Sequence, residues 1–224
     1  MSKRSTLVIL LLAAATDADV HAGNWVPLFD GHSLSGWSTL DGKPAVEGAW
    51  RVDEGALYLD ASKGRGGHLV TTREYGNFEL VFEWKIRHRA NSGIKYRVRD
   101  FNGRVLGCEY QIIDDVNHGG LRPAQTTASL YDVFAPTPHQ RLRPPGEYNR
   151  GCVIVCGNRI EHYLNGLRVV VAYPGSRTWN QRISASKFAD VEGFGRNHCG
   201  RIMLTDHGDE VWYRNIFIRE LSSR

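Results

Sequence analysis

The chain has 224 residues, and its 28 Lys and Arg against 24 Asp and Glu give a formal net charge of +4. Hydrophobic residues at 42% and charged residues at 23% are typical of a soluble globular protein. The basic residues are scattered, which argues against a nucleic-acid-binding protein and against a polybasic membrane-surface segment. With 24 Gly, 6 Trp and 9 Tyr, the composition favours a β-protein rich in turns.

The N-terminus has the pattern of a secretory signal peptide. Lys3 and Arg4 precede the apolar run 7–15, and Val20-His21-Ala22 offers small residues to a signal peptidase. We expect cleavage after Ala22, so that 1–22 is the signal peptide and 23–224 is one exported domain, periplasmic or extracellular. An uncleaved signal anchor is the alternative. No second long apolar run follows, so no membrane span is predicted in the mature chain.

The first part of the mature chain alternates apolar stretches with turn residues. Asp30-Gly31 is an expected turn, and 50–59 is an expected hairpin that reverses at 53–55. The glycine-rich stretch 63–67 lacks the spacing of a phosphate-binding loop, so an ordinary loop is predicted there. A short strand is expected at 68–72.

Two longer strands then show a period of two, with an apolar face and a face that bears ionisable groups. Segment 78–86 places Phe78, Leu80, Phe82, Trp84 and Ile86 on the apolar face. Segment 91–98 places Ile94, Tyr96 and Val98 on one face and Gly93, Lys95 and Arg97 on the other. This pattern is typical of a sheet that packs one side on a core and leaves the other wet.

The stretch 107–115 is the third of these strands and the one that bears the most unusual polar residues. Glu109 and Gln111 share one face, and Tyr110 and Ile112 share the other. A carboxylate and an amide on one strand face suit a polar cleft. Asp114, three residues beyond Gln111, would need a twist or bulge to join them.

The second half of the chain contains a long excursion and then more strands. Five of the eight prolines lie in 121–145, and a loop of this length inside a domain is usually functional. Trp179 to Glu192 could hold one short helix at 182–188. The expected strands are 152–155, 159–164, 167–172, 200–207 and 211–220, with a hairpin turn at Asn165-Gly166.

Four cysteines follow the predicted signal peptide, at positions 108, 152, 156 and 199. Cys152 and Cys156 would share a strand face roughly 13 Å apart, too far to bond each other. A disulfide with Cys108 or Cys199 and buried free thiols remain equally open. No Cys and His spacing indicates a structural zinc site.

Nine short motifs then appear in a fixed order. They are Phe29-Asp-Gly with Leu34-Ser-Gly-Trp37, Phe78-Glu-Leu, Asn91-Ser-Gly-Ile, Glu109-Tyr-Gln-Ile-Ile-Asp114, Leu130-Tyr-Asp132, Gly146-Glu-Tyr-Asn149, Glu161-His-Tyr-Leu-Asn-Gly166, Asp206-His-Gly208 and Arg214-Asn-Ile216. In this order they resemble the 3-keto-disaccharide hydrolase family over nearly all of 25–221. The resemblance implies an all-β, concanavalin A-like jelly roll, that is, a β-sandwich of two antiparallel sheets. It also implies bacterial export and action on glycosides oxidised at C3. Thr205 departs from the glutamine expected there, which bears on substrate preference.

A 3-keto sugar can be cleaved without an oxocarbenium ion, because the ketone acidifies the proton on C2. The site then needs a base near C2, a stabiliser of the enolate oxygen and an acid for the leaving group. The candidate catalytic residues are Glu109, His207, Arg97 and Asp114. The candidate substrate-binding residues are Asn91, Lys95, Gln111 and Tyr131. A divalent metal ion held by Glu109 and His207 is a further candidate stabiliser, although no metal signature is present and the metal ligands stay unassigned.

Two other functions fit the same fold. Glu109-x-Gln111-x-x-Asp114 echoes the strand of laminarinase-type glucanases, which use two carboxylates, although Gln111 and Asp114 both depart from that pattern. A lectin-like carbohydrate-binding module without catalysis is the other alternative. A small carbohydrate is the expected partner in all three cases, and the oligomeric state is left open.

Overall fold

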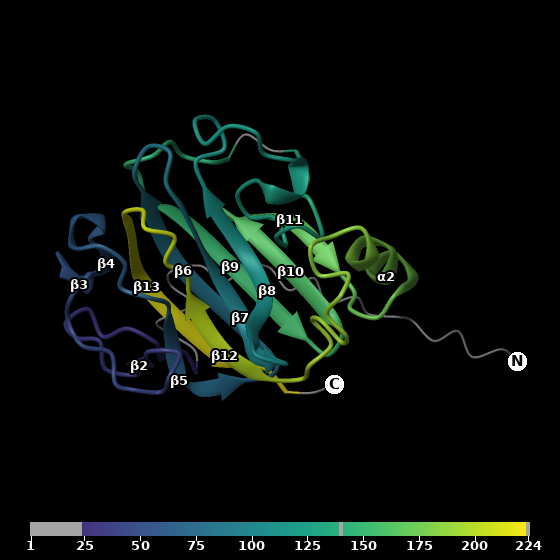
Figure 1. The fold of residues 1–224 in the computed structure, drawn as a ribbon, viewed down its shortest axis with the longest axis horizontal. Helices are drawn as coiled ribbons and strands as arrows, with labels where there is room; N and C mark the ends of the chain where they lie inside the picture. The colour runs from purple at the N-terminus through teal and green to yellow at the C-terminus, as the bar shows by residue number, and fades with distance from the viewer. Residues whose placement is uncertain (1–23, 139–140, 223–224) are drawn as a thin grey trace, which may run out of the picture.

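The computed structural model describes residues 24–138 and 141–222, and it shows two antiparallel sheets packed face to face (Figure 1). The predicted signal peptide, 1–22, lies outside the described residues. The all-β sandwich expected from the strand periodicity is therefore confirmed. Within the described residues, no helix is long and apolar enough to cross a membrane.

The larger sheet forms the back layer in Figure 1, with the strand order β11-β10-β9-β6-β13-β4-β3 and with β1 also paired to β13. Its strands are β1 (Val26–Pro27), β3 (Trp50–Asp53), β4 (Ala56–Leu59), β6 (Phe78–Ile86), β9 (Asn149–Cys156), β10 (Arg159–Leu164), β11 (Leu167–Ala172) and β13 (Val211–Glu220). The turn between β10 and β11 is the expected one, since Asn165 and Gly166 both have positive φ, 47° and 81°. This conformation is typical of a two-residue hairpin loop.

The smaller sheet forms the front layer in Figure 1, with the order β2-β5-β12-β7-β8. Its strands are β2 (Trp37–Ser38), β5 (Leu69–Tyr75), β7 (Asn91–Phe101), β8 (Arg104–Ile113) and β12 (Gly200–Leu204). The 3-10 turns η1 (Ala61–Lys63) and η2 (Pro123–Gln125) lie in loops. The inner faces of both sheets build one main core, which contains Phe78, Leu80, Phe82, Trp84 and Ile86 as their alternation predicts.

A bulge in β7 changes the expected faces of two residues. The pairing of β7 with β8 shifts register between Tyr96 and Arg99, and Arg97 has a φ of 49°. Beyond this point the alternation is displaced by one residue, as a bulge requires. Val98 therefore packs with Val70 and Met203, apart from the main core that holds Ile94 and Tyr96. The prediction that Arg97 shares a face with Lys95 was wrong for this reason.

The helix after β11 begins earlier than predicted. It is α2 (Arg177–Ser184), beside one edge of the sandwich in Figure 1, where 182–188 was expected. Ser176 caps it by accepting a hydrogen bond from the Trp179 backbone N–H at 3.1 Å. Trp179 is almost fully buried and stacks on Phe134, so packing of this ring fixes the helix position.

All four cysteines are free thiols in the structure. Cys108 and Cys152 are buried, and burial raises the pKa of the Cys108 thiol to about 12. Cys156 and Cys199 are partly exposed and likewise unbonded. Of the two possibilities left open by the sequence, the structure therefore shows free thiols.

His162 is a core histidine that links the two sheets. Its Nδ1 lies 2.9 Å from the carbonyl oxygen of Ala128, and its Nε2 lies 2.9 Å from the hydroxyl of Tyr96. Because a carbonyl can only accept, Nδ1 carries the proton and Nε2 accepts from Tyr96. Burial lowers the pKa of His162 to about 4, while the contact with Ala128 raises it slightly.

We expect this histidine to make the protein sensitive to acid. The pKa of His162 is about 4 in the folded chain and 6.5 ordinarily. The contribution of the neutral ring to the free energy of unfolding is therefore complete above pH 6.5 and is lost as the pH falls through 4. The shift corresponds to roughly 3 kcal/mol in the free energy of unfolding. Urea unfolding at pH 7 and pH 4 should show a smaller pH-dependent loss for His162→Gln than for the wild type. Equal losses would contradict the prediction.

Candidate functional site

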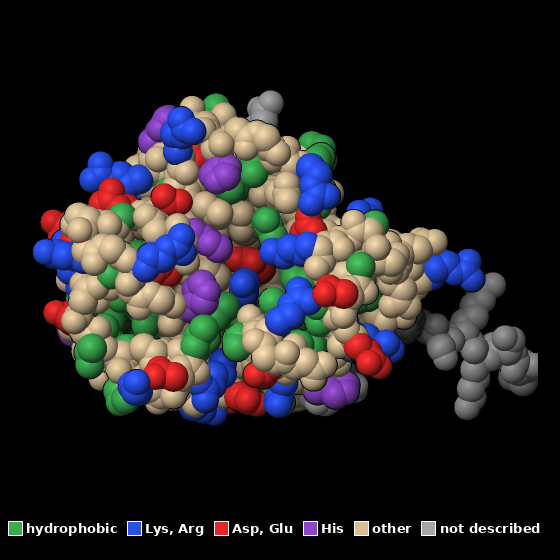
Figure 2. Space-filling view, in the orientation of Figure 1, with side chains coloured by type: hydrophobic (Ala, Val, Ile, Leu, Met, Phe, Trp, Pro, Cys, Tyr) green, Lys and Arg blue, Asp and Glu red, His purple; other side chains and the backbone are tan. Residues whose placement is uncertain are grey.

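The outer face of the smaller sheet carries a cluster of ionisable side chains. Lys95 on β7 is the register partner of Glu109 on β8, and Gly93 is the partner of Gln111. Figure 2 views this face and shows histidine, acidic and basic side chains gathered around a hollow near its centre. The predicted juxtaposition of Glu109, Gln111 and Lys95 on one wet face is therefore found.

Glu109 forms the buried base of this cluster. Its side chain is only 5% exposed, and Lys95 Nζ lies 3.9 Å from Oε2. No described residue donates a hydrogen bond to Oε1, although that atom is shielded from water. Burial raises the pKa of Glu109, and the positive charges of Lys95 and Lys187 partly offset that effect. A desolvated carboxylate with one unpaired oxygen is well suited to take a proton from a ligand.

Gly93 provides the space that the Glu109 carboxylate occupies. A Cβ placed on Gly93 would lie 2.4 Å from Glu109 Oε1 and 3.2 Å from its Cγ. The Gly93 carbonyl accepts hydrogen bonds from the backbone N–H of Thr205, at 3.0 Å, and from its hydroxyl, at 3.2 Å. Thr205, the residue that departs from the expected glutamine, is thus buried beneath the site and fixes the strand at Gly93.

One wall of the site comes from the long excursion after β8. Residues 128–131 run beside the edge of β8, where the Tyr131 backbone N–H donates to the Glu109 carbonyl at 3.0 Å. Lys187, on the segment after α2, places Nζ 4.2 Å from the centre of the Tyr131 ring. The Lys187 backbone N–H donates to Asp132 Oδ2 at 2.8 Å, which ties that segment to the excursion. Because an ammonium already covers a face of the Tyr131 ring, the structure favours a lysine-bearing wall over the sugar-stacking platform considered for this tyrosine.

The opposite wall combines the glycine-rich loop before β5 with the turn after β12. Asp206 Oδ2 accepts from the Gly67 backbone N–H at 2.8 Å, and the Asp206 backbone N–H donates to His68 Nδ1 at 3.0 Å. The His68 and His207 rings lie with their centres 6.5 Å apart in an edge-to-face arrangement. Partial burial and then the positive charge of Lys95 lower the pKa of both histidines, to about 4 for His207. Both imidazoles are therefore neutral at pH 7.

Two amide residues extend the same face towards the end of β7. Gln111 Nε2 donates to Asn91 Oδ1 at 3.1 Å, which confirms that these two predicted residues lie together. The Asn91 backbone N–H donates to Asp209 Oδ2 at 2.9 Å. Together the amides offer donors and acceptors suited to sugar hydroxyls beside Glu109.

Arg97 and Asp114 lie apart from this cluster. The Arg97 guanidinium is turned away by the β7 bulge and donates to the carbonyls of Gly76, at 3.0 Å, and Asn197, at 3.2 Å. Asp114 closes the turn after β8 by accepting from the backbone of Arg89 and from Asn117. Burial raises the Asp114 pKa, but these hydrogen bonds outweigh it and leave the pKa below its usual value. Both residues therefore have structural partners.

Sequence reasoning did not identify two residues of the site. His68 was assigned only to the start of a short strand, and Lys187 was assigned only to an expected helix. The pairing of the glycine-rich loop with Asp206, a residue inside a recognised motif, is a long-range contact that periodicity does not report. Lys187 carried no sequence signal, since it is a surface lysine in a polar segment.

No group of three or more His, Cys, Asp or Glu suited to a metal ion occurs within 24–138 and 141–222. Glu109 and His207, named as candidate ligands from the sequence, are therefore not part of such a group among those residues.

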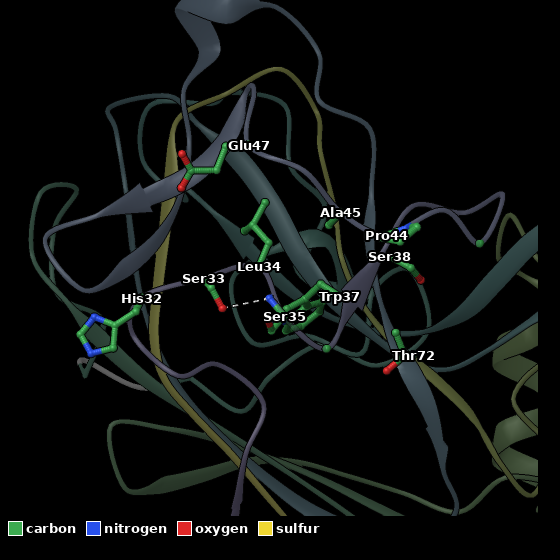
Figure 3. A pocket seen from close by; sticks show the side chains of 12 residues that line it. His32, Ser33, Leu34, Ser35, Trp37, Ser38, Pro44, Ala45, Glu47 and Thr72 are labelled. Atoms are coloured by element: carbon green, nitrogen blue, oxygen red, sulfur yellow. Dashed lines mark hydrogen bonds between the residues drawn. The ribbon is translucent and has the colours of Figure 1, made fainter.

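A separate hollow of about 540 Å³ lies near the N-terminal strands, and Figure 3 shows its lining. It borders Trp37, whose ring is buried and whose Nε1 donates to the Leu28 carbonyl at 2.8 Å. Trp37 therefore belongs to the core and not to a sugar-stacking surface. The residues labelled in Figure 3, including His32, Ser33 and Glu47, lie apart from the Glu109 cluster in the chain and bring no second ionisable cluster together.

The fold and this cluster together define a β-sandwich protein with a buried carboxylate and nearby lysines on the outer face of one sheet. Residues 24–219 match the family described as the 3-keto-alpha-glucoside-1,2-lyase-like domain. The chain is 31% identical to a 3-keto-disaccharide hydrolase of Bacteroides thetaiotaomicron over 234 positions, which cover 90% of this chain and 80% of that protein. The chain belongs to this family, and at the level of the family it is a glycoside-cleaving hydrolase.

Solved structures agree with this assignment. A crystal structure of a candidate glycosyl hydrolase from Parabacteroides distasonis has a TM-score of 0.80 and 28% identity, and it covers 94% of this chain and 100% of that chain. A second candidate glycosyl hydrolase from the same organism has a TM-score of 0.63 and 24% identity, with 89% and 100% covered. The second comparison supports the sandwich fold alone.

Proposed function

We propose that this protein cleaves glycosides whose sugar carries a ketone at C3, by elimination across C1 and C2 followed by addition of water. The observation that carries the proposal is Glu109, a buried carboxylate with one unpaired oxygen, 3.9 Å from the Lys95 ammonium and within the electrostatic influence of Lys187. The name of the Bacteroides thetaiotaomicron relative and the description of the family both concern 3-keto sugars, which supports this substrate class.

The reaction proceeds in balanced steps. Glu109 takes the proton from C2, and the C–H electron pair forms a C2=C3 bond while the carbonyl pair moves to the oxygen on C3. The enolate then re-forms the ketone, its electrons form a C1=C2 bond, and the C1–O bond breaks. The departing oxygen takes a proton. Water finally adds its hydroxyl to C1 and a proton to C2, so the net reaction is hydrolysis.

Glu109 is the base in this scheme because its surroundings disfavour the charged carboxylate. Desolvation raises its pKa, which makes the ionised form more basic than a surface glutamate. A base with a pKa closer to the working pH transfers protons more effectively. Lys95, 3.9 Å from Oε2, keeps the carboxylate ionised before reaction and supplies positive charge as the enolate forms.

The proton for the leaving oxygen is assigned to Lys187. Partial desolvation lowers the pKa of Lys187 and the Glu109 charge partly restores it, which leaves an ammonium that is a stronger acid than an ordinary lysine. It lies on the wall opposite His68 and His207, above Tyr131. His207, with a pKa of about 4, is neutral and is assigned to hydrogen bonding with the sugar, together with Asn91 and Gln111.

The conventional two-carboxylate glycosidase is less compatible with this site. That mechanism needs a second carboxyl group about 5 Å from the first in retaining enzymes. Asp114, the candidate from the sequence, is held in a turn by Arg89 and Asn117. Asp206 has both oxygens bonded to backbone N–H groups, those of Gly67 and Gly208. Of these three carboxylates, only Glu109 has an oxygen that accepts no hydrogen bond from a described residue, which supports elimination.

We also propose that the protein is exported as a mature chain that begins at Gly23. The support is the sequence pattern of Lys3 and Arg4, an apolar run and Val20-His21-Ala22.

A comparison of a glucoside with its 3-keto derivative, in D2O, tests the chemistry. We expect cleavage of the keto form only, with the parent at least about 10³-fold slower, because only the ketone acidifies C2. The released sugar should carry deuterium at C2 at the earliest time points. Enzyme-free product incubated for the same time controls for spontaneous exchange. Comparable cleavage of the parent glucoside would favour a two-carboxylate glycosidase, and binding without turnover of either would favour a lectin-like module.

A further inference from the structure

His68 is the residue of the hollow that the proposed steps leave without a role. It follows the glycine-rich loop 63–67 and is half-buried on the wall formed with Asp206 and His207. Lys95 influences the protonation of His68, of His207 and of Glu109, so His68 borders the same charged cluster. Its position is held from several sides.

The backbone around Asp206 builds a support for this ring. The Gly67 and Gly208 backbone N–H groups donate to the two Asp206 carboxylate oxygens at 2.8 and 2.7 Å. Arg65 Nη1 donates to the Asp206 carbonyl at 3.2 Å. The loop before β5 and the turn after β12 are thus tied together immediately beside His68.

The contact with Asp206 determines which nitrogen of His68 carries the proton. A backbone N–H can only donate, so His68 Nδ1, at 3.0 Å, must be the acceptor and the proton lies on Nε2. Protonation of the ring would place a second hydrogen on Nδ1, directed at the Asp206 N–H. No described residue accepts a hydrogen bond from Nε2, so its N–H is available to a ligand.

On balance, the burial of His68 and the charges that face it favour the neutral ring. Burial lowers its pKa, Lys95 on β7 and Arg65 on the loop lower it further, and the Asp206 carboxylate raises it. His207, on the turn after β12, is itself neutral at pH 7. The ring is therefore an uncharged donor at pH 7. A neutral imidazole can stabilise a developing enolate without giving up its proton.

We propose that His68 is a further catalytic residue, which donates a hydrogen bond from Nε2 to the ketone oxygen on C3 of the sugar. The inference rests on the proposed function, because that oxygen receives the negative charge when Glu109 takes the C2 proton. Lys95 supplies charge to the same oxygen, and His68 supplies a directed donor. No proton is transferred from His68 in this step.

Two substitutions separate the two sides of the ring. In His68→Gln the side-chain NH₂ group reaches the position of Nε2 and keeps the donor. In His68→Asn the side-chain oxygen takes the place of Nδ1, so this variant keeps only the acceptor for the Asp206 backbone N–H. We expect His68→Gln to keep kcat on the 3-keto glucoside within about tenfold, and His68→Asn to lose roughly 10²-fold in kcat, as for one oxyanion donor. The acid limb of the pH profile should be unchanged in His68→Gln.

Equal losses in the two variants, or loss of a titration step in His68→Gln, would overturn the proposal in favour of proton transfer by His68. A wild type that does not cleave the 3-keto glucoside would instead refute the proposed function. Nitrogen NMR of the labelled free protein gives a readout that needs no turnover. The ring-nitrogen signals of His68 are the wild-type signals that vanish in His68→Asn. At pH 7 they should show a protonated Nε2 and an unprotonated Nδ1 that accepts a hydrogen bond. A protonated Nδ1 would refute the assignment.

Discussion

Replacing Glu109 by Gln should lower kcat on a 3-keto glucoside by about 10³-fold, because a positioned general base contributes roughly 10² to 10⁴ in rate. Gln has nearly the same shape, so KM should change much less than kcat. The measurement is steady-state turnover of the wild type, Glu109→Gln and the control Glu192→Gln, which changes an exposed carboxylate outside the cluster. A loss of less than tenfold in Glu109→Gln would remove this residue from the role of base.

The same substitution should leave the fold intact and should not lower Tm at pH 7. Burial raises the pKa of Glu109 above its ordinary value of 4.5, so the ionised carboxylate opposes folding at neutral pH. That cost disappears as the pH falls through the folded pKa and below 4.5. We therefore expect Tm of Glu109→Gln to equal or exceed that of the wild type at pH 7, with the difference shrinking towards pH 4. A change of about 1 kcal/mol would shift Tm by roughly 2–4 °C. A marked fall in Tm would show that Glu109 is a structural ion-pair partner.

Gly93→Ala should reduce kcat by roughly 10²-fold, because a 1 Å displacement of a catalytic group is enough to cost that much. The new Cβ would lie 2.4 Å from Glu109 Oε1, and the strand cannot retreat while Thr205 holds the Gly93 carbonyl. The carboxylate must therefore move away from its place above Gly93. Turnover and thermal unfolding of the purified variant measure the two effects separately.

A control and a double variant show whether this loss passes through Glu109. Gly107→Ala, on β8, would place its Cβ 2.7 Å from the Tyr96 carbonyl oxygen, so it should lower Tm while kcat changes little. In the Glu109→Gln background, Gly93→Ala should add almost no further loss of kcat, because residues that act as a unit are non-additive. Additive losses in the double variant would mean that Gly93 acts through something other than the carboxylate.

On the outer face of the smaller sheet, the sequence predicted some side-chain positions correctly and others wrongly. The period-two pattern of 91–98 and 107–115 predicted adjacent strands with Lys95, Glu109 and Gln111 on a wet face, and the register confirms it. Alternation failed at Arg97, where one extra residue in β7 reverses the faces beyond Tyr96. No local residue pattern marked that bulge, since it depends on the pairing of β7 with its neighbours.

Strand periodicity and turn chemistry are local properties, so the residues alone predict the all-β sandwich, its hairpin turns and a strand face shared by Glu109 and Gln111. The family motifs likewise predict the membership. Three features become visible only in the folded chain: Glu109 is buried beneath Lys95, Asp114 closes a turn, and His68 and Lys187 form opposite walls. Those features join segments far apart in the chain, and burial and charge proximity exist only once the chain has folded.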